Sequence, residues 1–191
     1  MRVLRLQPWE RNLYLIVVAE LIGIMGFGIS VPFLPFYIQE LGVTRVEEVA
    51  SWVGLISSTS AIAMAVASPI WGVMGDRRGR KLMLVRAMLG GGITMALMGA
   101  VSTVPQLVVL RILQGLLAGS VAAATTLVAT SLPREQCGFG LGLLQTAIFA
   151  GHSLGPFVGG ALAGLVGYAP VFLGSGAMLL AAGVVVAVCV R

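Results

Sequence analysis

The chain has 191 residues, of which 58% are hydrophobic and 10% are charged, and its formal net charge is +5. Soluble domains carry about 25% charged residues, so this composition excludes an ordinary water-soluble fold. The apolar residues form six long runs, and about 20 such residues cross a bilayer as a helix. The runs cover residues 13–37, 49–74, 82–101, 105–131, 138–166 and 168–190. Because the connections are short, we predict one all-α polytopic membrane domain over residues 1–191, a compact bundle of six transmembrane helices.

Basic residues are concentrated on one side of the predicted spans. If the N-terminus lies inside, ten of the 12 Lys and Arg residues fall on the cytoplasmic side. Arg45 alone lies in the outer loops, together with Glu40, Glu47 and Glu48. This asymmetry follows the positive-inside rule and predicts cytoplasmic N- and C-termini in an inner or plasma membrane. Topology therefore explains the basic charge, which does not indicate a nucleic-acid partner.

The first run, residues 13–37, carries an ionisable residue, Glu20. A cleaved signal peptide is the alternative interpretation of this run, but signal peptides have apolar regions of only 7–15 residues. Counting from Asn12 at 1.5 Å per residue, Glu20 lies about 12 Å from the inner face. Ionisable residues inside spans usually face a cavity, a partner or a proton path.

A dense charged segment, GVMGDRRGRKLML, connects the second and third runs at residues 72–84. One interpretation is that it only orients the two spans, and this accounts for its Lys and Arg residues. It does not account for Asp76, or for Gly72 and Gly79.

The fourth run carries Arg111, about 9 Å from the outer face by the same helical rise. Its backbone differs in depth from that of Glu20 by roughly 9 Å, which two long side chains can bridge. One interpretation is a static ion pair that fixes the bundle. The other is that Glu20 binds and releases a proton while Arg111 modulates it or contacts substrate. Gln114 shares the face of Arg111, because residues three apart are neighbours on a helix.

The fifth run is rich in glycine. Small residues let helix backbones approach closely in lipid, and Gly151, Gly155 and Gly159 share one face at GxxxG spacing. Pro156 removes one hydrogen bond of the helix and leaves the carbonyl of His152 without its donor. We therefore expect a kink or a close crossing here, with His152 as a packed, neutral residue.

Three groups of residues resemble the signatures of the major facilitator superfamily, on the expected helices and in the expected order. The loop between the second and third helices matches at Gly72, Asp76, Arg77, Gly79, Arg80 and Lys81. The fourth helix matches at Arg111, Gln114, Gly115 and Gly119. The fifth matches the motif of proton-coupled antiporters at Gly142, Gly151, Gly155, Pro156, Gly159 and Gly160. The first run, with Pro32 and Pro35, is similar to the opening helix of twelve-span drug:proton antiporters.

The resemblance implies a half-carrier of three-plus-three inverted repeats that rocks against a second half about a midplane site. It implies that Asp76 and Arg77 form a cytoplasmic gating latch, in which Asp76 caps the eleventh helix when the inner side is closed. The glycines around Pro156 would then slide against that second half. The chain matches only the first six of twelve spans, so we expect the partner to be the missing C-terminal half or another copy. Cys137 stands where the resemblance places an arginine, although Glu135 remains available to pair with Arg77.

The predicted function is proton-coupled efflux of small, largely apolar or drug-like molecules by alternating access. Glu20 would bind the proton, and Arg111 and Gln114 would be its polar neighbours. A metabolite facilitator or symporter shares the same fold, and a non-transporting interaction or truncated half is a further alternative. With one His and two Cys residues, and no nucleophile–base or metal constellation in any span, we expect neither an enzyme nor a cofactor or metal site.

Overall fold

The computed structural model describes residues 7–30 and 32–190, so Arg2, Arg5 and Arg191 of the predicted charge asymmetry lie outside the described residues. The described part is helical and contains no strand. Its elements are α1 (Pro8–Ile29), α2 (Leu34–Glu40), α3 (Val46–Arg78), α4 (Arg80–Met98), α5 (Val104–Leu117), α6 (Ser120–Ser131), the 3₁₀ turn η1 (Arg134–Gln136), α7 (Cys137–Val166) and α8 (Tyr168–Cys189). Six segments of this part are long and apolar enough to cross a membrane. This confirms the predicted six-helix class.

Two of the predicted spans are interrupted. The first divides into α1 and α2, with Pro32 between them and Pro35 in the first turn of α2. Proline lacks the N–H that continues a helix, so the break follows from the sequence. The fourth divides into α5 and α6 at Gly119, whose φ of +117° is accessible mainly to glycine. Both runs, 13–37 and 105–131, therefore contain a helix break, although residues 104–131 together remain long and apolar enough for one membrane span.

The charged segment between the second and third spans is helical almost throughout. Helix α3 extends beyond the predicted residue 74 to Arg78, and α4 begins at Arg80. Only Gly79, with a φ of +97°, separates them. Acidic residues in the first turn of α3 and basic ones in its last turn complement the helix dipole. Asp76 and Arg77, predicted in a loop, therefore lie on the last turn of a rigid helix.

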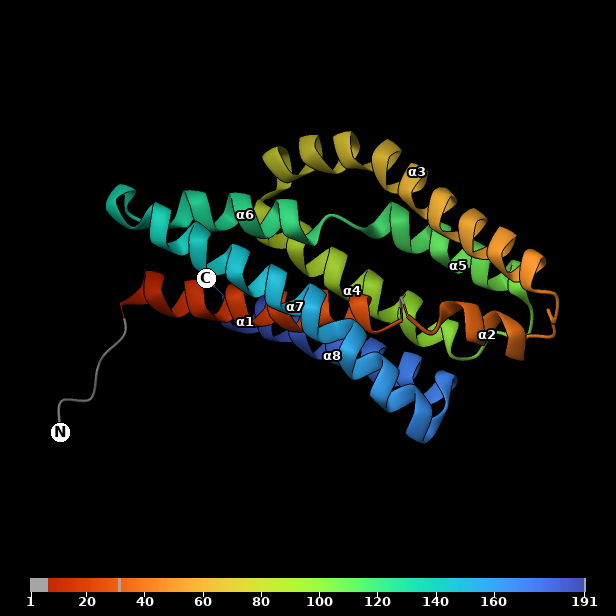
Figure 1. The fold of residues 1–191 in the computed structure, drawn as a ribbon. Coiled ribbons are helices and arrows are strands. Elements are labelled where there is room, and N and C mark those ends of the chain that lie inside the picture. The colour runs from red at the N-terminus through yellow and green to blue at the C-terminus, as the bar shows by residue number, and fades with distance from the viewer. Residues whose placement is uncertain (1–6, 31, 191) are drawn as a thin grey trace.

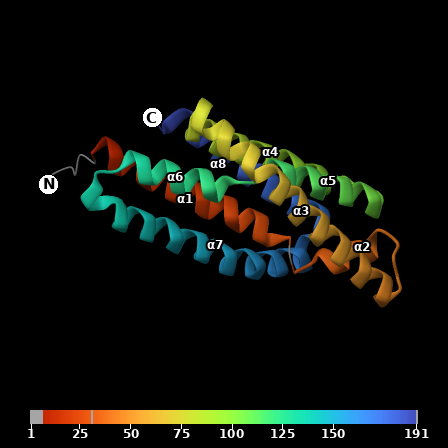
Figure 2. The same cartoon turned by 90° about the horizontal axis from the view of Figure 1, so that it is seen from above.

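The helices pair in a symmetric pattern. The most extensive contacts join α4 with α8, α1 with α7, and α3 with α5. The first three spans are α1, α3 and α4, and the last three are α5 with α6, α7 and α8. If the two sets are exchanged, the α1–α7 pair takes the place of the α5–α3 pair, and the α4–α8 pair is unchanged. An inverted repeat has this symmetry. Figure 1 shows α1, α7 and α8 on one side of the bundle, with α3 arching over α5 and α6 on the other. Seen from above, α7 lies along one edge, and α8 lies at the opposite edge beside α4 and α5 (Figure 2). The start of α1 and the end of α8 lie at the same end of the bundle (Figure 1).

The glycine face of α7 packs against α1 inside this bundle. A Cβ added at Gly155 would lie 2.7 Å from the carbonyl oxygen of Met25, and one at Gly159 would collide with that of Ile29. The prediction of a close crossing is thus met within this chain. Gly151, Gly155 and Gly159 are buried against α1. The expectation that these three glycines slide against a second half is therefore wrong, because α1 already covers them.

Candidate functional site

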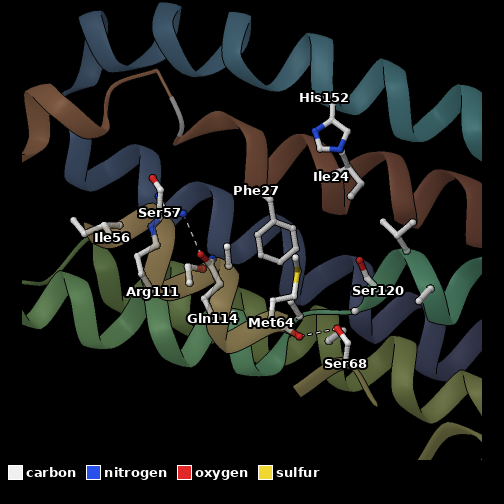
Figure 3. Close-up of a pocket in the computed structure, with 18 of the residues that line it drawn as sticks. Ile24, Phe27, Ile56, Ser57, Met64, Ser68, Arg111, Gln114, Ser120 and His152 are labelled. Atoms are coloured by element: carbon white, nitrogen blue, oxygen red, sulfur yellow. Dashed lines mark hydrogen bonds between the residues drawn. The ribbon is translucent and has the colours of Figure 1, made fainter. Parts of the chain in front are cut away.

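A cavity of about 790 Å³ lies between α1, α3, α5 and α6 (Figure 3). Apolar side chains such as Ile24, Phe27 and Met64 form much of its wall. The polar side chains on its wall are Ser57, Ser60, Ser68, Arg111, Gln114, Ser120 and His152. Its size is that of pockets that hold small molecules, which are typically about 300–1,000 Å³ and mostly apolar with a few placed polar groups.

Glu20 lies behind the cavity wall. Its side chain is 0% exposed, and its Oε1 accepts a 2.9 Å hydrogen bond from the Oγ of Ser120. Its Oε2 is buried without a hydrogen-bond partner. Because Ser120 itself lines the cavity, a single hydroxyl group connects this carboxyl group with the space where a ligand fits. A buried carboxyl group with one free oxygen can accept a proton there.

Arg111 lies at the other end of the cavity, beside Gln114. Its Nη1 donates to the Oε1 of Gln114 at 3.2 Å, and its Nη2 donates to the Oγ of Ser30 at 3.0 Å. Its Nε and the Nε2 of Gln114 are buried without a partner. Two of the three predicted binding residues therefore meet on the cavity wall (Figure 3).

The predicted pairing of Glu20 with Arg111 is absent from the described residues, whose ion pairs join other side chains. Arg111 is level with Ser30, and ten residues of helix separate Ser30 from Glu20, about 15 Å at 1.5 Å per residue. The depth estimate failed because the first helix starts at Pro8 and ends at Ile29, several residues before the predicted limits. The partner of Glu20 is Ser120, which the sequence analysis missed.

The break at Gly119 explains why Ser120 reaches Glu20. Helix α6 restarts at Ser120 with Gly119 as its N-cap residue, which turns the serine towards α1. In the sequence the pair Gly119–Ser120 lies in the middle of an apolar run, and a glycine there does not distinguish a break from a continuous transmembrane helix. His152, expected to be packed, is instead exposed at the cavity wall (Figure 3).

The hydroxyl groups of the second and fourth spans divide into two sets. Thr59 donates to the carbonyl of Leu55 at 2.7 Å, and Thr126 donates to that of Ala122 at 2.9 Å. These two are satisfied by their own helices, as threonine often is. Ser57 and Ser60 line the cavity instead.

The predicted latch residues lie at the end of the bundle, away from the cavity. Asp76 forms an exposed ion pair with Arg80, one turn along the chain, and Gly72 is open, with no atom within 4 Å of an added Cβ. The structure records no ion pair between Arg77 and Glu135 within the ranges it describes. Asp76 is therefore accessible to a partner outside this helix bundle.

The outward-facing glycines of α7 are also open. A Cβ at Gly142 or Gly160 would have no heavy atom within 4 Å. Of the predicted glycine–proline set, only these two positions leave room on the surface of the bundle. Over residues 7–30 and 32–190, no group of three or more His, Cys, Asp or Glu side chains is arranged to hold a metal ion.

Comparison with known proteins gives three related findings. The model of the Major Facilitator Superfamily matches residues 16–191. The multidrug resistance protein MdtG of Escherichia fergusonii and that of Escherichia coli are each 42% identical to this chain over 183 residues. The match covers 96% of this chain and 45% of each relative, so the chain spans about half their length.

A solved structure has the same fold. The human organic anion transporter MFSD10 (TETRAN) superposes with a TM-score of 0.80 at 19% sequence identity. The superposition covers 95% of this chain and 47% of the human protein. At this identity the likeness establishes the fold and nothing more specific.

Proposed function

The chain belongs to the major facilitator superfamily of membrane transporters, and we propose that it forms one half of a proton-coupled exporter of small, largely apolar, drug-like molecules. The observation that carries the proposal is Glu20, a fully buried carboxyl group one hydroxyl away from an apolar cavity. Ionisable groups within spans are costly and are typical of proton and substrate pathways. Two relatives of 42% identity are named multidrug resistance proteins, which supports drug-like substrates.

In the proposed cycle, Glu20 exchanges protons for substrate. Protonation of Glu20 from the outer side releases substrate, and loss of the proton towards the inner side readmits it. Arg111 and Gln114, joined by a 3.2 Å hydrogen bond, act as polar contacts at the far end of the same cavity. The two halves of such carriers rock about a site at the midplane. The second half is the missing C-terminal bundle or another copy of this chain.

We propose that both termini face the cytoplasm of a cell with this carrier in its inner or plasma membrane. Four basic residues of the described part, Arg77, Arg78, Arg80 and Lys81, gather in the last turn of α3 and the start of α4, at the opposite end of α3 from Arg45. The positive-inside rule assigns that end to the cytoplasm.

Transport by reconstituted protein tests this function directly. Vesicles that contain the natively encoded carrier, loaded with the lipophilic dye ethidium, are given a proton gradient that is acidic on the outer face of the protein. We expect the gradient to drive ethidium export, and a protonophore to reduce export to the level of empty vesicles. Counterflow of ethidium that ignores the gradient would instead favour a facilitator.

The latch makes a second prediction. Asp76→Asn removes only an exposed ion pair, so the free energy of unfolding should change by less than about 1 kcal/mol. A carboxylate at the N-terminus of a partner helix contributes up to about 2 kcal/mol, so export should fall about tenfold or more. The matched control is Glu47→Gln, which removes an exposed ion pair with Arg45 at the other end of α3. Equal export by the two variants would contradict a gating role for Asp76.

A further inference from the structure

The break in the fourth span exposes backbone carbonyls at mid-membrane depth. Helix α5 ends at Leu117 and α6 begins at Ser120, and the last carbonyls of a helix have no partner within it. The amide of Ala118 turns back to the carbonyl of Gly115 at 3.2 Å. At this depth such groups must be satisfied by the protein or by water in a cavity, because lipid offers no hydrogen-bond donors. Side chains that donate to these carbonyls can therefore stabilise the break.

Two residues from neighbouring helices supply the missing donors. The Nε1 of Trp71, on α3, donates to the carbonyl of Leu116 at 2.5 Å. The Nη2 of Arg86, on α4, donates to the carbonyl of Ala118 at 3.1 Å. The two donors also hold each other, because the guanidinium carbon of Arg86 lies 3.6 Å from the centre of the Trp71 ring. This distance is that of a cation–π contact.

The role of Arg86 goes beyond membrane orientation. The carbonyl of Ala118 is its one hydrogen-bond acceptor recorded in the described residues, and no carboxylate there pairs with it. Its Nε and Nη1 are buried without partners. An arginine that served only to orient the helices by the positive-inside rule would extend into water. The side chain of Arg86 is instead directed at the break, where it donates to the carbonyl of Ala118.

The geometry points to Arg86 and Trp71 as positioning residues that clamp the break in the fourth span. With Leu116 and Ala118 held, Gly119 keeps its φ of +117° and Ser120 keeps its 2.9 Å bond to Glu20. Because the break lies between α5 and α6, Ser120 is on a different helix from Arg111 and Gln114. The consequence of the clamp for proton exchange rests on the function proposed above, whereas its mechanical role does not.

Amide hydrogen exchange of the natively encoded protein in lipid nanodiscs tests the clamp. The informative amides are those of Ala118 and Ala123, whose backbone bonds flank the break at 3.2 Å each. We expect Arg86→Met to raise their exchange about tenfold, the order of change that the loss of one hydrogen bond to a charged donor produces. Trp71→Phe should act in the same direction, because phenylalanine has no N–H for the carbonyl of Leu116. Arg86→Lys keeps a charged donor above the ring and should restore most of the protection.

Two matched controls separate the clamp from general instability. Arg78→Met removes an exposed arginine at the end of α3, and Trp52→Phe removes an indole from the first half of the same helix. Both should leave exchange at Ala118 and Ala123 unchanged. Three results would overturn the proposal: unchanged exchange at the break in Arg86→Met, an equal rise in all helices, or no rescue by Arg86→Lys. Because the measurement needs no transport, it can succeed or fail independently of the export assay.

Discussion

Replacing Gly159 with alanine will destabilise the protein severely, and replacing it with leucine will prevent folding. A Cβ at this position collides with the carbonyl oxygen of Ile29, and it also lies 2.8 Å from the carbonyl carbon of that residue. Backbone atoms cannot rotate away as a flexible side chain can, so α1 and α7 must separate. Overpacking costs about 1–3 kcal/mol even where side chains can adjust. We expect a loss of about 3 kcal/mol for alanine, measured as unfolding of purified protein in detergent.

The neighbouring Gly160 offers the matched control. It lies on the same helix and has no heavy atom within 4 Å of an added Cβ. Alanine is favoured over glycine in a helix interior by up to about 1 kcal/mol, so Gly160→Ala should leave stability unchanged or raise it slightly. The two alanine substitutions are thus expected to have opposite signs. Similar losses for both would mean that the contact between α1 and α7 does not depend on the glycine face.

The spacing of these glycines predicted that a helix comes close but not which helix it is. GxxxG spacing follows from backbone approach in lipid, and any neighbouring helix satisfies it. The outward-facing Gly142 and Gly160 belong to the same motif as the buried Gly155. The sequence therefore correctly predicted that a helix approaches the glycine face of α7 closely. The prediction that this helix belongs to a second half was wrong for the buried glycines, which contact α1.

The number and character of the spans could be predicted because they depend on length and hydrophobicity alone. The two interruptions differ in this respect. Pro32 and Pro35 indicate the first one locally, but Gly119 is one of 26 glycines, and glycine is common in continuous transmembrane helices. The break depends on donors that come from α3 and α4, Trp71 and Arg86. No local pattern in the fourth span reports contacts made 45 and 32 residues away in the chain.

The sequence predicted which residues lie at the site better than it predicted which of them contact one another. Arg111 and Gln114 share a face and do contact each other, because their spacing within one helix is fixed. The relation between Glu20 and Arg111 depends on the relative depth of two helices. An error of a few residues in where a helix begins shifts that depth by several ångströms. At the depth found in the structure, Glu20 is too far from Arg111 for the expected ion pair and is bonded to Ser120 instead.

Substituting Glu20 by glutamine will abolish proton-coupled export while leaving the fold intact. Glutamine has nearly the same shape, and its amide oxygen can accept the hydrogen bond that Ser120 now donates to Oε1. The substitution removes the one carboxyl group found beside the cavity in the described residues, so no proton can be exchanged there. Stability should change little, because a neutral side chain is easier to bury than a carboxylate. The measurement is ethidium export and proton flux in the same vesicles.

Two comparisons make the Glu20 result specific. Glu40→Gln changes an exposed acid at the end of α2 and should export ethidium as the unmodified carrier does. Ser120→Ala removes the hydroxyl but keeps the carboxyl group, so export should be slowed and still coupled to protons. In Glu20→Gln, ethidium counterflow without a gradient should persist, because the cavity walls are unchanged. Export that still follows the proton gradient in this variant would remove Glu20 from the mechanism, and His152 on the opposite wall of the cavity would be the next titratable group to substitute.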